Sequence, residues 1–254
     1  MKKKIPPKFN YKLAKQYLEK EEIYDLINNY SLKNNNRMPP DIIDLARLHK
    51  TVRDFKIFTV LEFGIGYSTI VLYDALKKNK YDFSLFKFKI FKENKFELHS
   101  IDSSKKWINN FKKDFDKSLY NTSRIYYSSV YLSKYNDQIC SFYKKIPSIL
   151  PDFIYLDGPD PTTINNTINN IDYKNKDFVV MSGDILTFEN FLLPGCIILV
   201  DGRNTNLRFL KNNLKRKWLI IEDSKSSFSF LYLDEDPIGL KNLHYLNYRF
   251  DEKI

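Results

Sequence analysis

The chain has 254 residues and a formal net charge of +10, and 43% of its residues are hydrophobic and 16% aromatic. So many large apolar side chains exclude wholesale disorder, and 7 glycines with 10 prolines exclude a collagen-like or proline-rich scaffold. The length suits one α/β domain with an attached helical segment, or at most two small domains.

The cysteines and the apolar runs indicate a compartment. Cys140 and Cys196 are too few for a disulfide framework, and neither belongs to a CxxC pair. The basic start is not followed by the apolar stretch of a signal peptide, and no apolar run approaches the roughly 18 residues of a membrane helix. We therefore expect a cytoplasmic protein without a membrane span. Basic runs at 2–4 and 211–217 could contact nucleic acid or anionic lipid, but a solvated lysine-rich surface is the simpler interpretation.

Helices are expected before any strand. Apolar residues recur at helical spacing over 11–30, the Asn-rich stretch 31–40 interrupts them, and a second helix begins near Asp41. We assign residues 1–55 to an N-terminal helical cap.

From residue 56 onwards, short apolar strands alternate with polar helices, which implies a largely parallel sheet with right-handed crossovers. Residues 80–95 alternate aromatic and lysine side chains and are interpreted as an inserted hairpin or loop. Helices are expected over 104–118, after the second strand, and in the Thr/Asn-rich segment after the fourth strand. Residues 131–150 give no clear pattern. The first five strands are expected at 57–63, 96–102, 124–130, 151–158 and 196–202.

Two further strands, 217–223 and 227–234, are joined by a short Ser/Lys turn. This turn is too short for a crossover helix, so the two strands must pair antiparallel. The predicted fold is therefore α/β and doubly wound: a mostly parallel seven-stranded sheet, closed by an antiparallel hairpin and preceded by the helical cap. We assign residues 56–234 to this domain and 235–254 to a C-terminal tail.

Polar motifs lie at the expected carboxyl ends of the strands, where open parallel sheets bind ligands. A glycine turn over 62–68 follows the first strand and would let backbone N–H groups approach a ligand closely. Asp102 ends the second strand, where a carboxylate can accept both hydrogens of a ribose diol. The other two motifs are DGPD at 157–160 and DGRN at 201–204. Each motif alone could be a turn or a helix cap, but sheet geometry does not require acids at all of these ends together.

In these motifs the sequence resembles the class I S-adenosylmethionine-dependent methyltransferase family. The antiparallel closing hairpin also matches that fold and distinguishes it from dinucleotide-binding Rossmann domains. The resemblance covers about residues 57–233 and is carried by VLEFGIGYST (60–69), ELHSID (97–102), PDFIYLDGPD (151–160) and LLPGCIILVDGR (192–203).

The resemblance implies S-adenosylmethionine as the cofactor and a methyl transfer to a small or glycan-like acceptor, with oxygen as the favoured atom. It assigns Glu62, Gly64 and Gly66 to the methionine moiety and Asp102 and Ser103 to the ribose. Ser129 or Val130 would lie near the adenine, Asp157 would face the sulfonium, and Ser68 would be a further cofactor-binding residue.

The candidate catalytic residues are Asp157, Asp201 and Arg203. Asp157 would lie nearest the transferred methyl group and could take the proton of the acceptor. Arg203 and Arg208 could grip an anionic acceptor by bidentate contacts, or could pair with nearby acids that fix their helix.

A metal is a separate question. Relatives of the catechol O-methyltransferase type bind Mg²⁺ through acids ending strands four and five and an adjacent Asn. Asp157 and Asp201 occupy matching places, and oxygen ligands suit Mg²⁺. The adjacent position holds Gly202, however, with Asn204 two residues further on. Mg²⁺ is thus an open alternative, and we assign no metal ligands.

Competing functions fit less well. The G-x-G-x-x-G motif of an NAD-dependent oxidoreductase would need a third glycine where Thr69 stands. Its acidic residue should follow after about 20 residues, whereas Asp102 comes much later in this chain. A nucleic-acid partner is not expected, because amino-methyltransferases of nucleic acids carry an Asn/Asp-Pro-Pro-Tyr/Phe turn where this chain has DGPD at 157–160. A non-catalytic binding module with this fold stays open, as does the oligomeric state.

Overall fold

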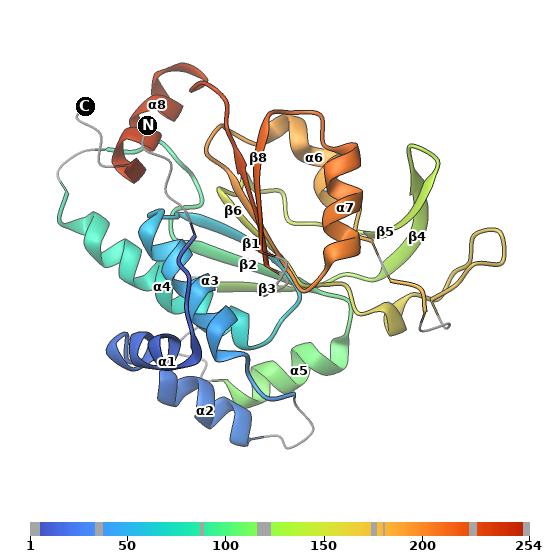
Figure 1. The fold of residues 1–254 in the computed structure, drawn as a ribbon, viewed down its shortest axis with the longest axis horizontal. Coiled ribbons are helices and arrows are strands. Elements are labelled where there is room, and N and C mark those ends of the chain that lie inside the picture. Colours follow the sequence, from blue (N-terminus) through green and yellow to red (C-terminus); the bar gives the residue numbers. More distant parts are fainter. Residues whose placement is uncertain are drawn as a thin grey trace.

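The computed structural model describes residues 6–33, 38–86, 89–115, 123–173, 177–179, 181–223 and 228–250. Their central feature is a seven-stranded sheet with the strand order β3-β2-β1-β6-β7-β9-β8 (Figure 1). The strands are β1 Thr59–Phe63, β2 Glu97–Asp102, β3 Ser123–Tyr127, β6 Phe153–Leu156, β7 Ile197–Asp201, β8 Trp218–Asp223 and β9 Phe228–Leu233.

The pairing confirms the predicted doubly wound topology. Strands β3, β2, β1, β6 and β7 pair parallel, whereas β9 pairs antiparallel with both β7 and β8. The chain winds from β1 outwards through β2 to β3, and then returns to place β6 on the other side of β1. The strand order therefore reverses between β1 and β6, and the carboxyl ends of these two strands are the expected ligand position.

The sheet is buried on both faces, which explains why its parallel strands are continuous apolar runs. All residues of β1 and β6 are buried. One face packs against α3 (Ile42–Asp54) and α4 (Tyr67–Ser84), with α1 (Tyr11–Lys20) outside them. The other face packs against α6 (Asp184–Phe188) and α7 (Asn204–Asn213).

The N-terminal helices share the core of the sheet. Asp41 begins α3 by accepting hydrogen bonds from the backbone N–H groups of Ile43 and Asp44, at 3.0 and 3.1 Å. The single helix expected over 11–30 is instead two helices, α1 and α2 (Tyr24–Leu32), because the chain turns at Glu22, whose φ is +61°.

Two inserted segments differ from the prediction. Residues 80–84 continue α4, whereas residues 85–86 and 89–95 form a loop, one of the two predicted alternatives, and residues 87–88 lie outside the described part. The unassigned stretch 131–150 holds most of an antiparallel hairpin, β4 (Val130–Tyr135) and β5 (Gln138–Tyr143), which packs apolar side chains against the second face of the sheet.

The helices after the second and fourth strands also differ from the prediction. The segment after β6 forms only one 3-10 turn, η2 (Pro161–Thr163), since Asn and Thr side chains compete with the backbone bonds of a helix. Helix α5 spans Lys105–Asp114, and the predicted continuation over 116–118 lies outside the described residues.

The C-terminal segment is a structural element of the core. Helix α8 (Gly239–Phe250) places Tyr245 and Tyr248 against Phe58, beside the start of β1. Arg249 is fully buried and donates hydrogen bonds to the carbonyl oxygens of Phe55 and Gly195, at 2.8 and 2.7 Å. Helix α8 is therefore packed against the domain through its buried residues from Asn242 to Arg249, while the division of the chain at 55 and 234 stays a prediction. Of the helices described, none has the length and apolar character to traverse a lipid bilayer.

Candidate active site

A cleft of about 550 Å³ lies at the carboxyl ends of β1, β2, β6 and β7. The topology brings the separate sequence motifs together there, because parallel strands end at one edge of the sheet. Seven of the residues singled out in the sequence line this cleft: Gly64, Gly66, Ser68, Asp102, Asp157, Asp201 and Arg203.

The glycine turn forms the floor between β1 and α4. Gly64 has a φ of +110°, and its N–H donates to the carbonyl oxygen of Ile101 at 2.8 Å, which ties the turn to β2. A β-carbon at Gly66 would meet nothing within 4 Å, whereas one at Gly158 would lie 3.0 Å from the backbone nitrogen of Gly64. The turn is therefore held tightly from β6, and it leaves open space at Gly66.

Glu62 supports this turn from below. Its fully buried carboxylate accepts hydrogen bonds from the hydroxyls of Ser68, Thr69 and Ser100 at 2.6, 2.9 and 2.5 Å. Burial raises the pKa of Glu62 to about 7, and the three hydroxyls oppose that rise. Glu62 thus joins the start of α4 to β2 without lining the cleft, and its contact with a methionine moiety stays a prediction.

Asp102 lies at the end of β2 on the wall of the cleft. It accepts a hydrogen bond from the backbone N–H of Ser104 at 2.6 Å, which fixes the carboxylate. Burial raises its pKa to about 6, and the backbone N–H donors oppose the rise. The carboxylate is therefore ionised at neutral pH and can accept hydrogen bonds from a diol.

Ser103 and Ser129 do not line the cleft. The Ser103 hydroxyl accepts a hydrogen bond from the hydroxyl of Thr163 at 2.7 Å. The carbonyl oxygen of Ser129 accepts from the backbone N–H of Lys144 at 2.9 Å. The structure therefore gives both residues contacts within the protein, and their predicted roles toward ribose and adenine stay predictions.

Asp157 and Asp201 end the neighbouring strands β6 and β7. Asp157 is exposed to the cleft. Desolvation by the surrounding cleft walls and the charge of Asp201 raise its pKa to about 6, against the opposing effect of Arg203. Asp201 accepts a hydrogen bond from the hydroxyl of Tyr155 at 2.8 Å. A carboxylate with such a pKa is ionised at neutral pH and still basic enough to accept a proton.

The two arginines are not brought together. The guanidinium of Arg203 donates to the backbone carbonyl oxygens of Asp157 and Pro159. Arg208 lines a separate pocket between α7 and the β8–β9 pair. Because Arg208 lies in a different pocket from Arg203, the two arginines cannot hold one anionic acceptor together in the cleft.

One wall of the cleft comes from the N-terminal region, which sequence reasoning did not assign to the site. The ring of Tyr30 packs edge-on against Tyr67 at 5.3 Å between centroids. Asp44, in the first turn of α3, accepts from the guanidinium of Arg47 at 2.6 Å. Burial, and then the charge of Asp201, raise the pKa of Asp44 to about 7. Acidic residues are common in the first turn of a helix because they stabilise it. The position of Asp44 in the sequence therefore gave no sign that it lines the cleft.

The residues present do not form an evident Mg²⁺ site. Within the described ranges, no group of three or more His, Cys, Asp or Glu side chains is arranged to hold a metal ion. Asn204, the possible third ligand, lines the pocket of Arg208 and not the cleft. We therefore assign no chemical step to a metal.

Comparison with known proteins identifies the fold. No family model and no curated protein sequence matches the chain. Among solved structures, the S-adenosylhomocysteine-bound methyltransferase PaMTH1 of Podospora anserina is 15% identical, with a TM-score of 0.50, and the match covers 92% of this chain and 100% of that one. A putative caffeoyl-CoA O-methyltransferase from Staphylococcus aureus is 12% identical over 88% of this chain and 100% of that one, with a TM-score of 0.47. The fold is thus α/β and Rossmann-like, of the kind seen in class I methyltransferases.

Proposed function

We propose that this chain is an S-adenosylmethionine-dependent methyltransferase. The observation that carries the proposal is the position of Asp102, Asp157 and the open glycine turn around one cleft, at the reversal of the strand order. This arrangement places a diol acceptor, a close backbone approach and a basic carboxylate within one ligand-sized space.

S-adenosylmethionine would supply an activated methyl group for transfer to a nucleophile. Asp102 would accept hydrogen bonds from its ribose hydroxyls, and Gly64 and Gly66 would let it approach the backbone of the turn. Carboxylates along the cleft suit a cofactor that carries a positive sulfonium. Glu62 would act by holding Ser68 and Thr69 in place under the turn.

In the transfer, the protein mainly aligns the acceptor and removes its proton. We assign the proton to the carboxylate of Asp157, because it opens onto the cleft and its pKa is raised to about 6. Asp201 would keep that carboxyl basic by its charge, and Arg203 would fix the backbone of 157–159 from which Asp157 projects.

The acceptor we favour is a small hydroxyl-bearing molecule, a sugar included, that is neutral or cationic. Its pocket is lined by six aspartates and by Arg203, whose guanidinium already bonds to backbone carbonyls. An anionic acceptor would face repulsion from these aspartates. The six are Asp41, Asp44, Asp102, Asp157, Asp160 and Asp201. We also propose a cytoplasmic location, since both cysteines are free and buried.

The first test is calorimetric titration of the purified chain with S-adenosylhomocysteine. We expect saturable binding that Asp102→Ala abolishes, and that the matched control Glu19→Ala, on the exposed surface of α1, leaves unchanged. No binding to stripped wild-type protein would refute the proposal. Binding without turnover on any hydroxyl acceptor, with or without added Mg²⁺, would favour the alternative of a non-catalytic binding module.

A further inference from the structure

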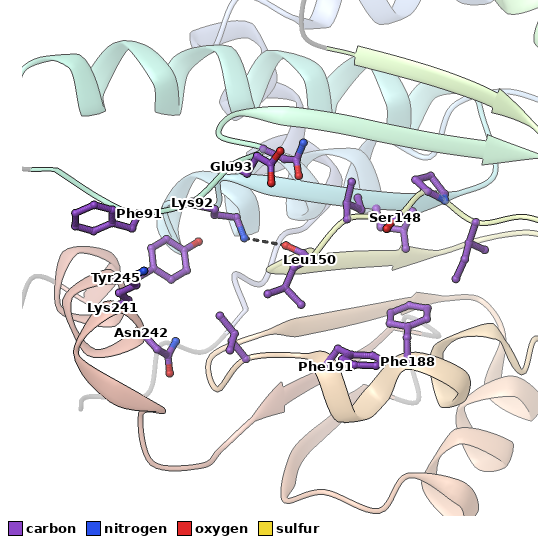
Figure 2. Close-up of a pocket in the computed structure, with 16 residues that line it drawn as sticks. Phe91, Lys92, Glu93, Ser148, Leu150, Phe188, Phe191, Lys241, Asn242 and Tyr245 are labelled. Carbon is purple, nitrogen blue, oxygen red and sulfur yellow. Dashed lines mark hydrogen bonds between the residues drawn. The ribbon is translucent and has the colours of Figure 1, made fainter.

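A second cavity, of about 780 Å³, lies at the opposite edge of the sheet from the cleft (Figure 2). Its lining includes segments that precede strands: Asn94 before β2, Leu150 before β6 and Leu193 before β7. Helix α8 contributes Lys241 and Tyr245 to its wall. The volume lies within the range of about 300–1,000 Å³ that is typical of small-molecule sites.

One end of this cavity is apolar and open to solvent. The rings of Phe188 and Phe191 lie together there, on the side opposite Phe91 and α8 (Figure 2). The side chain of Phe191 is 70% exposed, and Leu150 in the middle of the cavity is 36% exposed. Exposed aromatic side chains around a concave surface mark a place where apolar groups bind.

The other end carries positive charge. Lys241 lies beside Phe91, with its ammonium 5.3 Å from the ring centroid. Lys92 is mostly buried and donates to the carbonyl oxygen of Leu150 at 2.9 Å, which places its ammonium in the cavity wall (Figure 2). Lys89 does not line the cavity, but its ammonium lies 5.2 Å from the centroid of the same Phe91 ring.

The negative groups near these lysines are largely neutralised. Asp152 pairs with Lys92 at 3.1 Å, and it also accepts the backbone N–H groups of Phe58 and Thr59, each at 2.8 Å. Glu93 is the other acid and lies in the lining near Lys92. The buried Arg249 opposes the charge of Asp152 as well. The three cations Lys92, Lys241 and Arg249 therefore outnumber the two acids Asp152 and Glu93, which leaves this end of the cavity net positive.

We propose that this cavity binds an amphipathic small molecule with an aliphatic chain and an anionic headgroup, such as a long-chain carboxylate. The chain lies over Leu150, Phe188 and Phe191, and the carboxylate lies beside Lys241 and Lys92. A purely apolar ligand would fit less well, because it would leave the charges of the lysines without a partner. The proposed site shares no lining residue with the cofactor cleft.

The test is fluorescence titration of the full chain with dansyl-undecanoate, followed by displacement with decanoate or decanol. We expect saturable binding of one probe per chain. Phe191→Gln should weaken it about tenfold, since a ring of this size contributes much of the buried apolar area. Lys241→Gln should weaken binding of the probe severalfold, because the probe carries the same carboxylate. After correction for this lower probe affinity, the inhibition constant of decanoate should rise severalfold and that of decanol should stay unchanged. Both side chains are exposed, so neither change should affect folding, which circular dichroism would verify.

Matched controls are Phe178→Gln and Lys12→Gln, which alter exposed residues outside the cavity. The proposal is overturned if the probe does not saturate, or if the cavity variants bind as these controls do. It is also overturned if the protein sediments with phosphatidylglycerol vesicles but ignores the free probe, because the surface would then be a membrane contact. Loss of S-adenosylhomocysteine binding in Asp102→Ala, with probe binding retained, would show that the two sites are separate.

Discussion

At the scale of single residues, Asp157 has the most testable chemistry. Its pKa is raised to about 6 by burial and by the nearby charge of Asp201. A general base acts only when ionised, so kcat/KM should rise with pH, with a midpoint near pH 6, and level off above it. Asp157→Asn should lower kcat by a factor of about 10²–10⁴. A pH series of initial rates on one acceptor would measure both effects.

The control for this experiment is binding of S-adenosylhomocysteine to the same variant. If Asp157 mainly removes a proton, Asp157→Asn binds the product cofactor nearly as well as the wild type does. A flat pH profile in the wild type, or full activity in the variant, would contradict the assignment. The proton would then have to leave by another group, and Asp44 would be the next candidate, because it faces the same cleft and its pKa is raised to about 7.

Two glycines give a matched pair of variants. A β-carbon at Gly158 would lie 3.0 Å from backbone atoms of Phe63 and Gly64, which cannot move without opening the turn. Gly158→Ala should therefore lower the free energy of unfolding by about 1–3 kcal/mol. At Gly66 the φ is 175°, which any residue adopts, and the space is open.

Gly66→Ala should thus keep the stability of the wild type but weaken binding of S-adenosylhomocysteine, because the new methyl group would enter the space meant for the cofactor. Thermal unfolding and calorimetry on both variants would separate these effects. Unchanged cofactor affinity in Gly66→Ala would mean that the ligand does not approach this turn.

At the scale of elements, a buried histidine joins the N-terminal helices to α4. His49 of α3 lies between the hydroxyl of Tyr17 at 2.7 Å, from α1, and the carboxylate of Asp74 at 2.9 Å, from α4. Burial lowers the pKa of His49 below 6.5, although Asp74 opposes that shift. The imidazole is therefore neutral in the folded protein over a pH range in which the unfolded chain already binds a proton.

The sign of the pH effect follows from this difference. Below pH 6.5 the unfolded state takes up a proton that the folded state excludes, so the contribution of His49 to stability is lost as the pH falls. His49→Gln should reduce the loss of stability between pH 7.5 and about 5.5, measured by urea unfolding. His244→Gln, at an exposed site on α8, is the control. Identical pH dependence in both variants would contradict the role of His49.

Helix α8 offers a second prediction at this scale. Arg249 is buried and donates to two backbone carbonyl oxygens that belong to distant parts of the chain, Phe55 and Gly195. Arg249→Met would leave both carbonyls without this donor and should cost about 2–5 kcal/mol in the free energy of unfolding. Lys241→Met, on the exposed side of the same helix, should change it by less than about 0.5 kcal/mol. Equal unfolding midpoints would show that α8 is not part of the cooperative core.

At the scale of the whole molecule, the sequence allowed prediction of those features that have a local pattern. The five parallel strands and the closing hairpin each have a periodic apolar run, and Gly64, Asp102 and Asp157 follow such runs directly. The contribution of Asp44 to the cleft depends on how α3 packs on the sheet, which no local pattern records. The same holds for α8, and for Arg208, which the turn of α7 directs into another pocket.

The distribution of charge over the molecule leads to the last prediction. The chain has a net charge of +10, yet the described lining of the cleft contains six aspartates and one arginine. Phosphates would be attracted to the lysine-rich exterior and repelled from the site of transfer. Binding to a labelled single-stranded RNA should therefore be weak, fall steeply with salt and be lost by about 0.3 M NaCl.

This binding should also be indifferent to the state of the cleft. Anisotropy titrations should give the same RNA affinity for wild-type protein, for protein saturated with S-adenosylhomocysteine and for Asp157→Asn, because the contacts lie on lysines outside the site. If S-adenosylhomocysteine strengthened RNA binding, or if methyl groups from the cofactor appeared in the RNA, a nucleic acid would be the acceptor. The acidic cleft would then have to exclude the phosphates and admit only a base or ribose turned away from the backbone.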